Sequence, residues 1–341
     1  MKQDSYTRFF NLVTGFLRVY LPKQRNRSQC TIKSYTAGLN LFRNFLLETR
    51  SIPFKKITFD VFTHATVYDY LEWLKTTRNA SAATVNQRFA GLKSFLKYAA
   101  DEDLTLMATY ADVQKVRPPK PKRKPVKWMS EESLEILFKQ APQSRIGRRN
   151  LCIMVLLFDT AARIQELLDL KLNSFNLGEG GPTITLFGKS RKTRVLPLME
   201  KTVKYLTEYL HAFHRKPDNN DYLFYTVIHS KREQMSPDTV AYFLKNYGEI
   251  ARQSSPLVPE RVHPHLLRHS RAMGLYKSKV PLPLIARFLG HVDINTTDIY
   301  ATADLDMMKD AMDRASLDFT PAIKPNWEGN EDMMLRLCGL A

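Results

Sequence analysis

The stretch HLLRHSRAMGLYKSKVPLPLIARFLGHVDINTTDIY, residues 265–300, decides the fold. It opens with His265 and Arg268 in a His-x-x-Arg pair, reaches a Leu-Gly-His motif at His291 and ends nine residues later at Tyr300. Arginine and histidine side chains can donate charge-assisted hydrogen bonds to phosphate oxygens, and a phenol beside them can act as a nucleophile. This order and spacing are hard to produce by chance, so we predict a cationic phosphate cradle with a tyrosine next to it.

Two more cations lie upstream of this stretch. Arg163 stands in Ala-Arg-Ile-Gln-Glu-Leu, and Lys189 stands in Gly-Lys-Ser-Arg-Lys. The anionic oxygens of a phosphodiester repel a nucleophile, and more charge develops in the transition state, so guanidiniums at Arg163 and Arg268 would stabilise it. Taken alone, Arg163 could instead form a structural salt bridge with Glu166, three residues further on.

Taken jointly, these motifs resemble the tyrosine recombinase or phage integrase family, which includes the Xer and Cre recombinases. The resemblance covers nearly the whole chain. It implies a site-specific recombinase or integrase of a mobile element, an enzyme that breaks and rejoins DNA strands. The catalytic residues that it implies are Arg163, Lys189, His265, Arg268, His291 and Tyr300.

The resemblance also implies a role for each of the non-arginine residues. Tyr300 would attack the phosphorus to form a 3′-phosphotyrosyl bond and release a 5′-hydroxyl, which conserves the bond energy for religation without ATP. Lys189, placed by the family's Gly-Lys pattern, would protonate the departing 5′-oxygen. His265 would accept a proton near Tyr300 or bind phosphate, and His291 would donate to a non-bridging oxygen.

The chain departs from the family pattern at a few positions. Ala162 stands where the family commonly has glycine, and Gln165 stands where a small residue is usual, so the turn that carries Arg163 is expected to fit differently. Glu166 is expected to orient Arg163. At the predicted hairpin tip, Arg191 and Lys192 compete with Lys189 for the role of general acid.

Two alternatives stay open on the sequence alone. A type IB topoisomerase uses similar chemistry, and a DNA-binding accessory protein would keep the fold without catalysis. His263, His265 and His269 could suggest a metal site, but they have no cysteine or carboxylate companion at ligand spacing. We therefore expect no metal and no cofactor, and cleavage that proceeds in EDTA.

Composition favours a polyanionic partner. The 341 residues hold 51 Lys and Arg against 34 Asp and Glu, a net charge of +17, with a pI near 9.7. Such a balance favours double-stranded DNA through phosphate contacts, although a generally basic protein or one that meets an acidic membrane surface would look similar.

The beginning of the chain lacks the apolar run of a signal peptide, and the longest apolar run, residues 153–158, is too short for a membrane span. We expect a cytoplasmic protein without membrane contact, in which Cys30, Cys152 and Cys338 are reduced thiols.

A proline-rich basic segment divides the chain. Residues 116–127 hold four prolines and six Lys or Arg without an acidic residue, which predicts an extended linker. Residues 1–115 carry 17 basic and 9 acidic residues, and residues 128–341 carry 28 and 25. We predict a helical core DNA-binding domain at 1–115, a catalytic domain at 128–320 and a C-terminal tail at 321–341.

The predicted N-terminal domain contains two amphipathic patterns. Apolar residues recur with 3-4 spacing over residues 32–46 and again over 85–96, which predicts helices capped by Ser28 and Ser81. The resemblance adds that this part is a SAM-like domain that clamps DNA. The expected DNA contacts come from these helices and the linker: Lys33, Arg43, Arg88, Lys93, Lys120, Lys122, Arg123 and Lys124.

The predicted catalytic domain is α+β, so the fold class is mainly α with a small β-sheet. Ser130 should cap one helix, residues 150–160 should form an apolar core helix, and residues 183–187 and 193–196 should form a hairpin with a basic tip. In the tail, Asn330 should cap a short helix with Met333, Leu337 and Leu340 on one face. The resemblance implies that this helix is exchanged between protomers of a homo-tetramer on synapsed DNA. A directionality factor is a further partner that the sequence leaves open.

Overall fold

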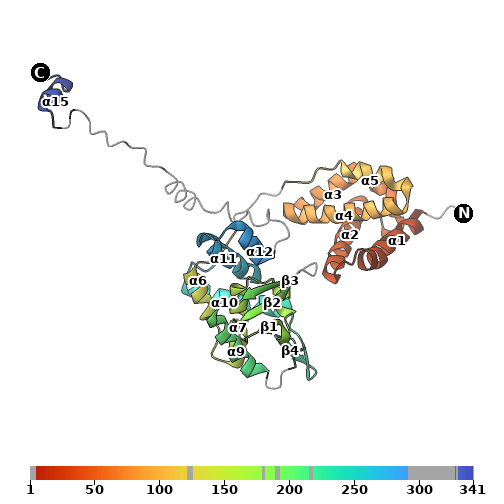
Figure 1. Cartoon of the computed structure of the whole chain (residues 1–341). Helices are drawn as coiled ribbons and strands as arrows, with labels where there is room; N and C mark the ends of the chain where they lie inside the picture. Colours follow the sequence, from red (N-terminus) through yellow and green to blue (C-terminus); the bar gives the residue numbers. More distant parts are fainter. Residues whose placement is uncertain are drawn as a thin grey trace. The chain divides into compact units, whose positions relative to one another are not determined.

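The computed structural model describes residues 5–120, 126–178, 181–188, 193–214, 218–290, 327 and 329–340. The chain divides into two compact units, Met1–Lys124 and Pro125–Ala341 (Figure 1). The division falls inside the proline-rich segment 116–127. Each unit has its own buried core.

All the regular secondary structure in the described residues of the first unit is helical. Its α-helices are α1 Ser5–Gly15, α2 Gln29–Arg50, α3 His64–Thr76, α4 Ala82–Glu102 and α5 Met107–Gln114, with a π-helical segment at Phe16–Gln24 and 3-10 turns at Phe54–Lys56, Phe59–Val61 and Leu104–Leu106. The Ser28 side chain accepts a hydrogen bond from the N–H of Thr31, and that of Ser81 accepts one from Thr84. Both predicted caps are therefore confirmed.

The core of the first unit forms where α2 and α4 meet. Phe42 and Leu46 of α2 are buried, and α4 buries its whole predicted apolar stripe, Val85, Phe89, Leu92 and Leu96. Burial of each large apolar side chain contributes about 1.5–3 kcal/mol relative to exposure. Gly91 of α4 faces the Tyr35 ring of α2, where an added Cβ would make an ordinary van der Waals contact at 3.5 Å.

The second unit packs helices around two small sheets. Its helices are α6 Glu131–Phe138, α7 Arg145–Asp159, α8 Ile164–Leu168, α9 Glu200–Phe213, α10 Pro237–Ser254, α11 Pro264–Lys277, α12 Leu282–Leu289 and α15 Glu331–Leu337, with a 3-10 turn at Leu172–Ser174. The strands are β1 Phe175–Asn176, β2 Thr183–Phe187, β3 Thr193–Pro197, β4 Tyr225–Ile228 and β5 Lys231–Gln234. The predicted fold class, mainly α with small sheets, is confirmed.

The strands form two antiparallel sheets. The first has the order β1-β2-β3, and β2 pairs with β3 from Thr183↔Pro197 to Phe187↔Thr193, which confirms the predicted hairpin. The second, β4-β5, was not predicted. Its two-residue turn places His229 and Ser230 at φ 47° and 61°. Such turns favour glycine and asparagine, so His-Ser gave no turn signal.

Helix α7 forms the centre of the second core. Ser144 caps it, so it begins five residues before the apolar run at 150–160, and it buries Cys152, Ile153, Leu156 and Leu157. A smaller core links the end of this helix to α11 and α12 through Ala161, Ala272, Met273, Ile285 and Leu289. This smaller core fixes the backbone on which the candidate site is built.

Three further features complete the described fold. Asn330 caps α15 as predicted, by accepting a hydrogen bond from the N–H of Met333, and Met333, Leu337 and Leu340 are exposed in the single chain. Cys30 and Cys338 are exposed, whereas Cys152 is buried, and burial raises the pKa of its thiol. Across the described ranges, no helix is long and apolar enough to cross a membrane.

Candidate active site

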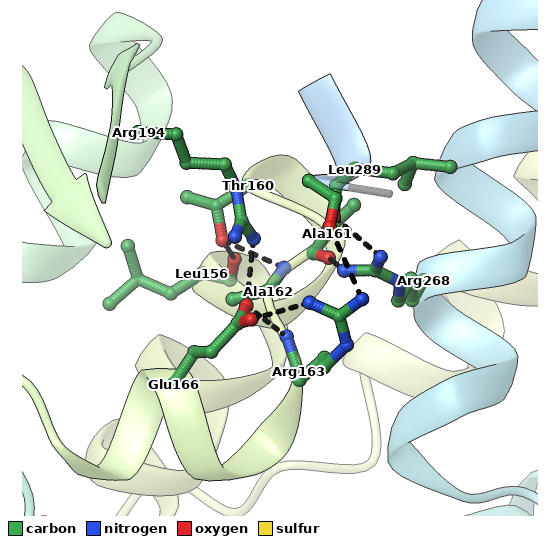
Figure 2. A network of polar contacts seen from close by, with 10 residues as sticks. Leu156, Thr160, Ala161, Ala162, Arg163, Glu166, Arg194, Arg268 and Leu289 are labelled. Carbon is green, nitrogen blue, oxygen red and sulfur yellow. Dashed lines mark hydrogen bonds and ion pairs between the residues drawn. The ribbon is translucent and has the colours of Figure 1, made fainter. Parts of the chain in front are cut away.

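The site is built on the tight turn that follows α7. The Thr160 hydroxyl donates to the Leu156 carbonyl at 2.6 Å and accepts from the Ala162 N–H at 3.2 Å. Ala161 is fully buried and adopts a left-handed conformation, φ 46°. The chain then reverses at Arg163, which begins α8 as its N-cap residue. The turn therefore presents the Arg163 guanidinium from a buried, hydrogen-bonded segment of backbone (Figure 2).

The structure adds a residue that the sequence interpretation of this turn did not single out. Ala162 is the residue that the sequence predicts to alter the turn's fit, but the left-handed residue is Ala161. A left-handed conformation costs a residue with a Cβ about 1–2 kcal/mol relative to glycine. The buried Ala161 methyl group offsets part of this cost, because it packs in the smaller core.

Glu166 is the centre of a charged network (Figure 2). Its Oε1 accepts from Arg163 Nη1 at 2.6 Å, and its Oε2 accepts from the Arg163 N–H at 3.0 Å and from Arg194 Nη2 at 2.8 Å. Burial raises the pKa of Glu166, but the hydrogen bonds and charges of Arg194 and Arg163 outweigh that effect and leave the pKa below its usual value. The carboxylate is therefore ionised and orients Arg163.

The second predicted arginine, Arg268, lies beside the first. It projects from α11, is 4% exposed, and donates from Nη1 to the Ala161 carbonyl and from Nη2 to the Leu289 carbonyl at 2.6 Å. Arg163 Nη2 donates to the next carbonyl, that of Gly290, at 3.4 Å. Carbonyls at a helix C-terminus have no partner within the helix and carry partial negative charge. The end of α12 thus brings two guanidiniums together.

The histidines of α11 are held in their neutral form. His263 caps the helix through Nδ1, which accepts from the Leu266 N–H at 3.2 Å. Partial desolvation and the charges of Arg268 and Arg163 lower the pKa of the exposed His265. Desolvation and neighbouring positive groups lower that of His269 to about 4. His265 lies one helical turn before Arg268, so its imidazole is placed near the guanidinium and is able to accept a proton at neutral pH.

Several predicted residues lie outside the described residues. They are Lys189, Arg191, Lys192, His291 and Tyr300. The described chain comes within one residue of three of them: Gly188 precedes Lys189, Thr193 follows Lys192, and Gly290, which has φ 65° and caps α12, precedes His291. Three of the six predicted catalytic residues, Arg163, His265 and Arg268, are thus placed by the structure.

The predicted DNA-contacting residues of the first unit have different environments. Lys33, Arg43 and Lys120 are exposed. Arg88 is half-buried and donates from Nη1 to the Ser34 carbonyl at 3.1 Å, which ties α4 to α2. The ammonium of Lys93 lies 4.6 Å from the centre of the Phe89 ring. Lys122, Arg123 and Lys124 lie outside the described residues.

Two functional features were missed by the sequence interpretation. Arg194 was not singled out, although strand alternation places it on the same face of β3 as the buried Leu196, and a charge on a core face needs a partner. Asp159 was also missed: it accepts a hydrogen bond from Thr202 of α9 and pairs with Arg271 of α11 at 3.3 Å. These contacts anchor the end of α7 to two other helices.

The described part of the chain offers no group of three or more His, Cys, Asp or Glu side chains placed to hold a metal ion. The arrangement that is present consists of guanidiniums, a carboxylate that orients one of them, and a neutral imidazole. Such a set can bind a phosphate group and stabilise charge that develops on its oxygens.

Comparison with known proteins identifies the family. The model of the Phage integrase family matches residues 127–306, and that of the Phage integrase N-terminal SAM-like domain matches residues 13–103. Tyrosine recombinase XerA of Pyrococcus furiosus is 30% identical and covers 85% of this chain and 90% of its own. The chain belongs to the phage integrase family. It is a tyrosine recombinase, a site-specific enzyme that breaks and rejoins DNA strands.

Solved structures share the fold. The XerH site-specific recombinase, bound to a palindromic difH substrate in a post-cleavage complex, has a TM-score of 0.67 at 22% identity, covering 89% of this chain and 88% of that chain. A lambda integrase tetramer bound to a Holliday junction has a TM-score of 0.63 at 16% identity, covering 86% and 76%. At these identities the likeness concerns the fold alone.

Proposed function

We propose that this recombinase cleaves DNA through a 3′-phosphotyrosyl intermediate at Tyr300, with Arg163 and Arg268 binding the scissile phosphate. The observation that carries the proposal is the convergence of the two guanidiniums on the consecutive carbonyls of Leu289 and Gly290. Fixed, permanently charged donors of this kind stabilise a pentacoordinate phosphorane better than water does, because they need no reorganisation during the reaction.

The proposed reaction is balanced without a cofactor. The Tyr300 oxygen forms a bond to phosphorus and loses its proton, for which neutral His265 is the acceptor. The bond from phosphorus to the 5′-oxygen breaks, and Lys189 protonates that oxygen. His291 donates to a non-bridging oxygen. Religation reverses these steps, with the 5′-hydroxyl as the nucleophile.

The proposed partners are double-stranded DNA and further copies of the chain. The XerH structure contains a DNA substrate, and the lambda integrase structure contains a tetramer on a Holliday junction. We propose the same tetrameric arrangement here, with the tail 321–341 exchanged between protomers. We also propose that the recombinase acts on the DNA of a mobile element, which the match to a phage integrase model supports.

A nicked duplex tests the chemistry. The DNA sequence is first selected from a randomised duplex pool by binding to the full-length protein, and a nick near the cleavage point traps the covalent product. Wild type should form an adduct that survives denaturing electrophoresis, in EDTA as well as in Mg²⁺. Tyr300→Phe should form none but should bind the same DNA with near wild-type affinity, because only the hydroxyl is removed.

Two results would contradict the proposal: an adduct formed by Tyr300→Phe, or strict dependence of cleavage on Mg²⁺. Relaxation of supercoiled DNA without any preferred site would be compatible with the proposed intermediate but would favour the topoisomerase alternative over a recombinase.

A truncated chain tests the proposed tetramer. The apolar residues Met333, Leu337 and Leu340 are exposed in the single chain, which supports burial of α15 on a neighbouring protomer. A chain that ends before Pro325 should fold and bind one site but lose cooperative binding and strand exchange. Analytical ultracentrifugation measures cooperative assembly on DNA, and a recombination assay measures strand exchange. Normal synapsis by the truncated chain, or its misfolding, would contradict exchange of the helix.

A further inference from the structure

Glu166 is shared by two arginines, and this sharing sets the net charge of the three groups. The carboxylate is 5% exposed and accepts from both Arg163 and Arg194 (Figure 2). One negative charge thus faces two positive charges. A lone pairing of Glu166 with Arg163 would neutralise the phosphate-binding guanidinium, whereas the trio keeps one net positive charge next to the phosphate position.

Arg194 is held by Glu166, to whose Oε2 its Nη2 donates at 2.8 Å. Its side chain is 11% exposed, compared with 34% for the side chain of Arg163. Its guanidinium packs directly against Gly290, where an added Cβ would lie 2.9 Å from Nη1. The contact joins Arg194 to the same turn whose carbonyl accepts from Arg163. Arg194 therefore acts on the site through its neighbours.

Arg194 lies near the outer end of the β2-β3 hairpin. Arg194 pairs with Leu186 in the register of β2 and β3, one step from the last pair, Phe187↔Thr193. The segment between these strands contains Lys189, the proposed general acid. A single guanidinium at the outer end of the hairpin thus contacts both the Glu166 carboxylate and the Gly290 turn.

We propose that Arg194 is a positioning residue that couples the β2-β3 hairpin, and through it the general acid Lys189, to the phosphate-binding turn at Arg163. This inference rests on the proposed function. Without Arg194, Glu166 still holds Arg163 through two hydrogen bonds, but the hairpin loses its ionic attachment to the site. The main consequence is poorer protonation of the leaving 5′-oxygen.

A sulfur-substituted substrate separates protonation of the leaving group from charge stabilisation at the phosphate. In one duplex the scissile 5′-oxygen is replaced by sulfur, and its thiolate leaves without a proton because thiols are far more acidic than alcohols. Single-turnover cleavage is measured on the oxygen and sulfur duplexes, which share one selected sequence. General-acid catalysis contributes about 10²–10⁴-fold, so Arg194→Gln should lose about 10²-fold on oxygen and recover to within about tenfold of wild type on sulfur.

Matched variants define the comparison. Lys189→Ala should behave like Arg194→Gln, whereas Arg163→Gln should be slow on both duplexes because charge stabilisation is missing in each. Arg232→Gln is the control for the substitution itself: it removes an arginine from β5 that pairs with Asp221 at 2.9 Å and should cleave both duplexes like wild type. Arg194→Lys, which keeps the charge, should recover part of the cleavage rate on the oxygen duplex. It replaces Arg194→Gln in the comparison if that variant does not fold.

The possible outcomes distinguish the two proposals. Suppose that wild type forms the adduct and that the sulfur duplex rescues Lys189→Ala. If both Arg194 variants then cleave the two duplexes with equal defects, or with no defect, the coupling is overturned and the proposed function stands. If wild type forms no adduct with either duplex, the proposed function fails and the coupling fails with it. Rescue of Arg194→Gln to the same degree as Lys189→Ala supports the coupling.

Discussion

Two pairs of cations, one pair in each unit, have opposite environments. In the first unit, Lys33 and Arg43 stand exposed on α2, where water screens their charge. In the second unit, Arg268 is 4% exposed and the Arg194 side chain 11%, and each is held by carbonyl or carboxylate oxygens. Burying a charge costs several kcal/mol unless its geometry and partners compensate. The first arrangement therefore suits attraction to any phosphate backbone, and the second suits the binding of a single phosphate by donors held in fixed positions.

The largest effect is expected from removing the buried carboxylate. Glu166→Gln keeps the side-chain size but leaves Arg163 and Arg194 without their shared negative charge. Breaking a buried ion pair by removing one partner destabilises a protein by about 3–5 kcal/mol, and cleavage should fall at least about 10²-fold because Arg163 loses its orientation. Urea denaturation and the covalent-adduct assay measure these two quantities.

Variants of the exposed cations provide the contrast with Glu166→Gln. Lys33→Ala and Arg43→Ala should change the free energy of unfolding by less than about 0.5 kcal/mol. Equal destabilisation by Glu166→Gln and by these variants would remove the distinction between the two units.

A smaller effect is expected from the linker. Replacing Lys120, Lys122, Arg123 and Lys124 by alanine should weaken binding to every DNA sequence. It should also reduce the slope of log affinity against log salt by up to about one unit for each phosphate that the linker no longer neutralises. The matched control removes four exposed lysines of the second unit and gives the same net charge: Lys139, Lys201, Lys204 and Lys245. Equal slopes for the two variants would mean that total charge matters and the linker's position does not.

The smallest effect concerns pH. Burial first, and then His265, Arg268 and His263, lower the pKa of His269 to about 4 in the folded chain, against about 6.5 in an unfolded one. Between these values only the unfolded chain binds the proton. The free energy of unfolding should therefore fall by about 1–2 kcal/mol from this group between pH 7.5 and pH 5, and should not change above pH 7.5 on its account.

A His269→Gln variant isolates this contribution. Its free energy of unfolding, measured with urea at both pH values, should fall less than that of wild type. An equal fall in the two proteins would show that His269 titrates normally, and that the histidines of α11 are no more constrained than a surface group.

The regular parts of the fold were predictable because their signals are local. Ser28, Ser81 and Ser130 precede apolar periodicity and cap α2, α4 and α6. The β2-β3 hairpin follows from two short strands around a basic turn. In each case a few neighbouring residues determine the backbone conformation, so the sequence alone was sufficient.

The missed features depend on contacts between distant segments. The pairing of Arg194 with Glu166 joins residues 28 positions apart, and no local pattern records it. Ala161 adopts a left-handed conformation, and the contacts made there come from distant residues: Arg268, 107 positions away, donates to its carbonyl, and the smaller core encloses its methyl group. For the same reason the motifs predicted Arg163 and Arg268 as site residues but did not reveal that α12 brings them together.

The three cysteines have a practical consequence for spectroscopy. Cys30 on α2 and Cys338 after α15 are exposed, whereas Cys152 is buried with a raised thiol pKa. Maleimide dyes react with accessible thiolates, so they should label the first unit and the tail of the native chain and spare the core. A donor and an acceptor attached at Cys30 and Cys338 then report the distance between α2 and the tail by energy transfer, as DNA is added, without any engineered residue.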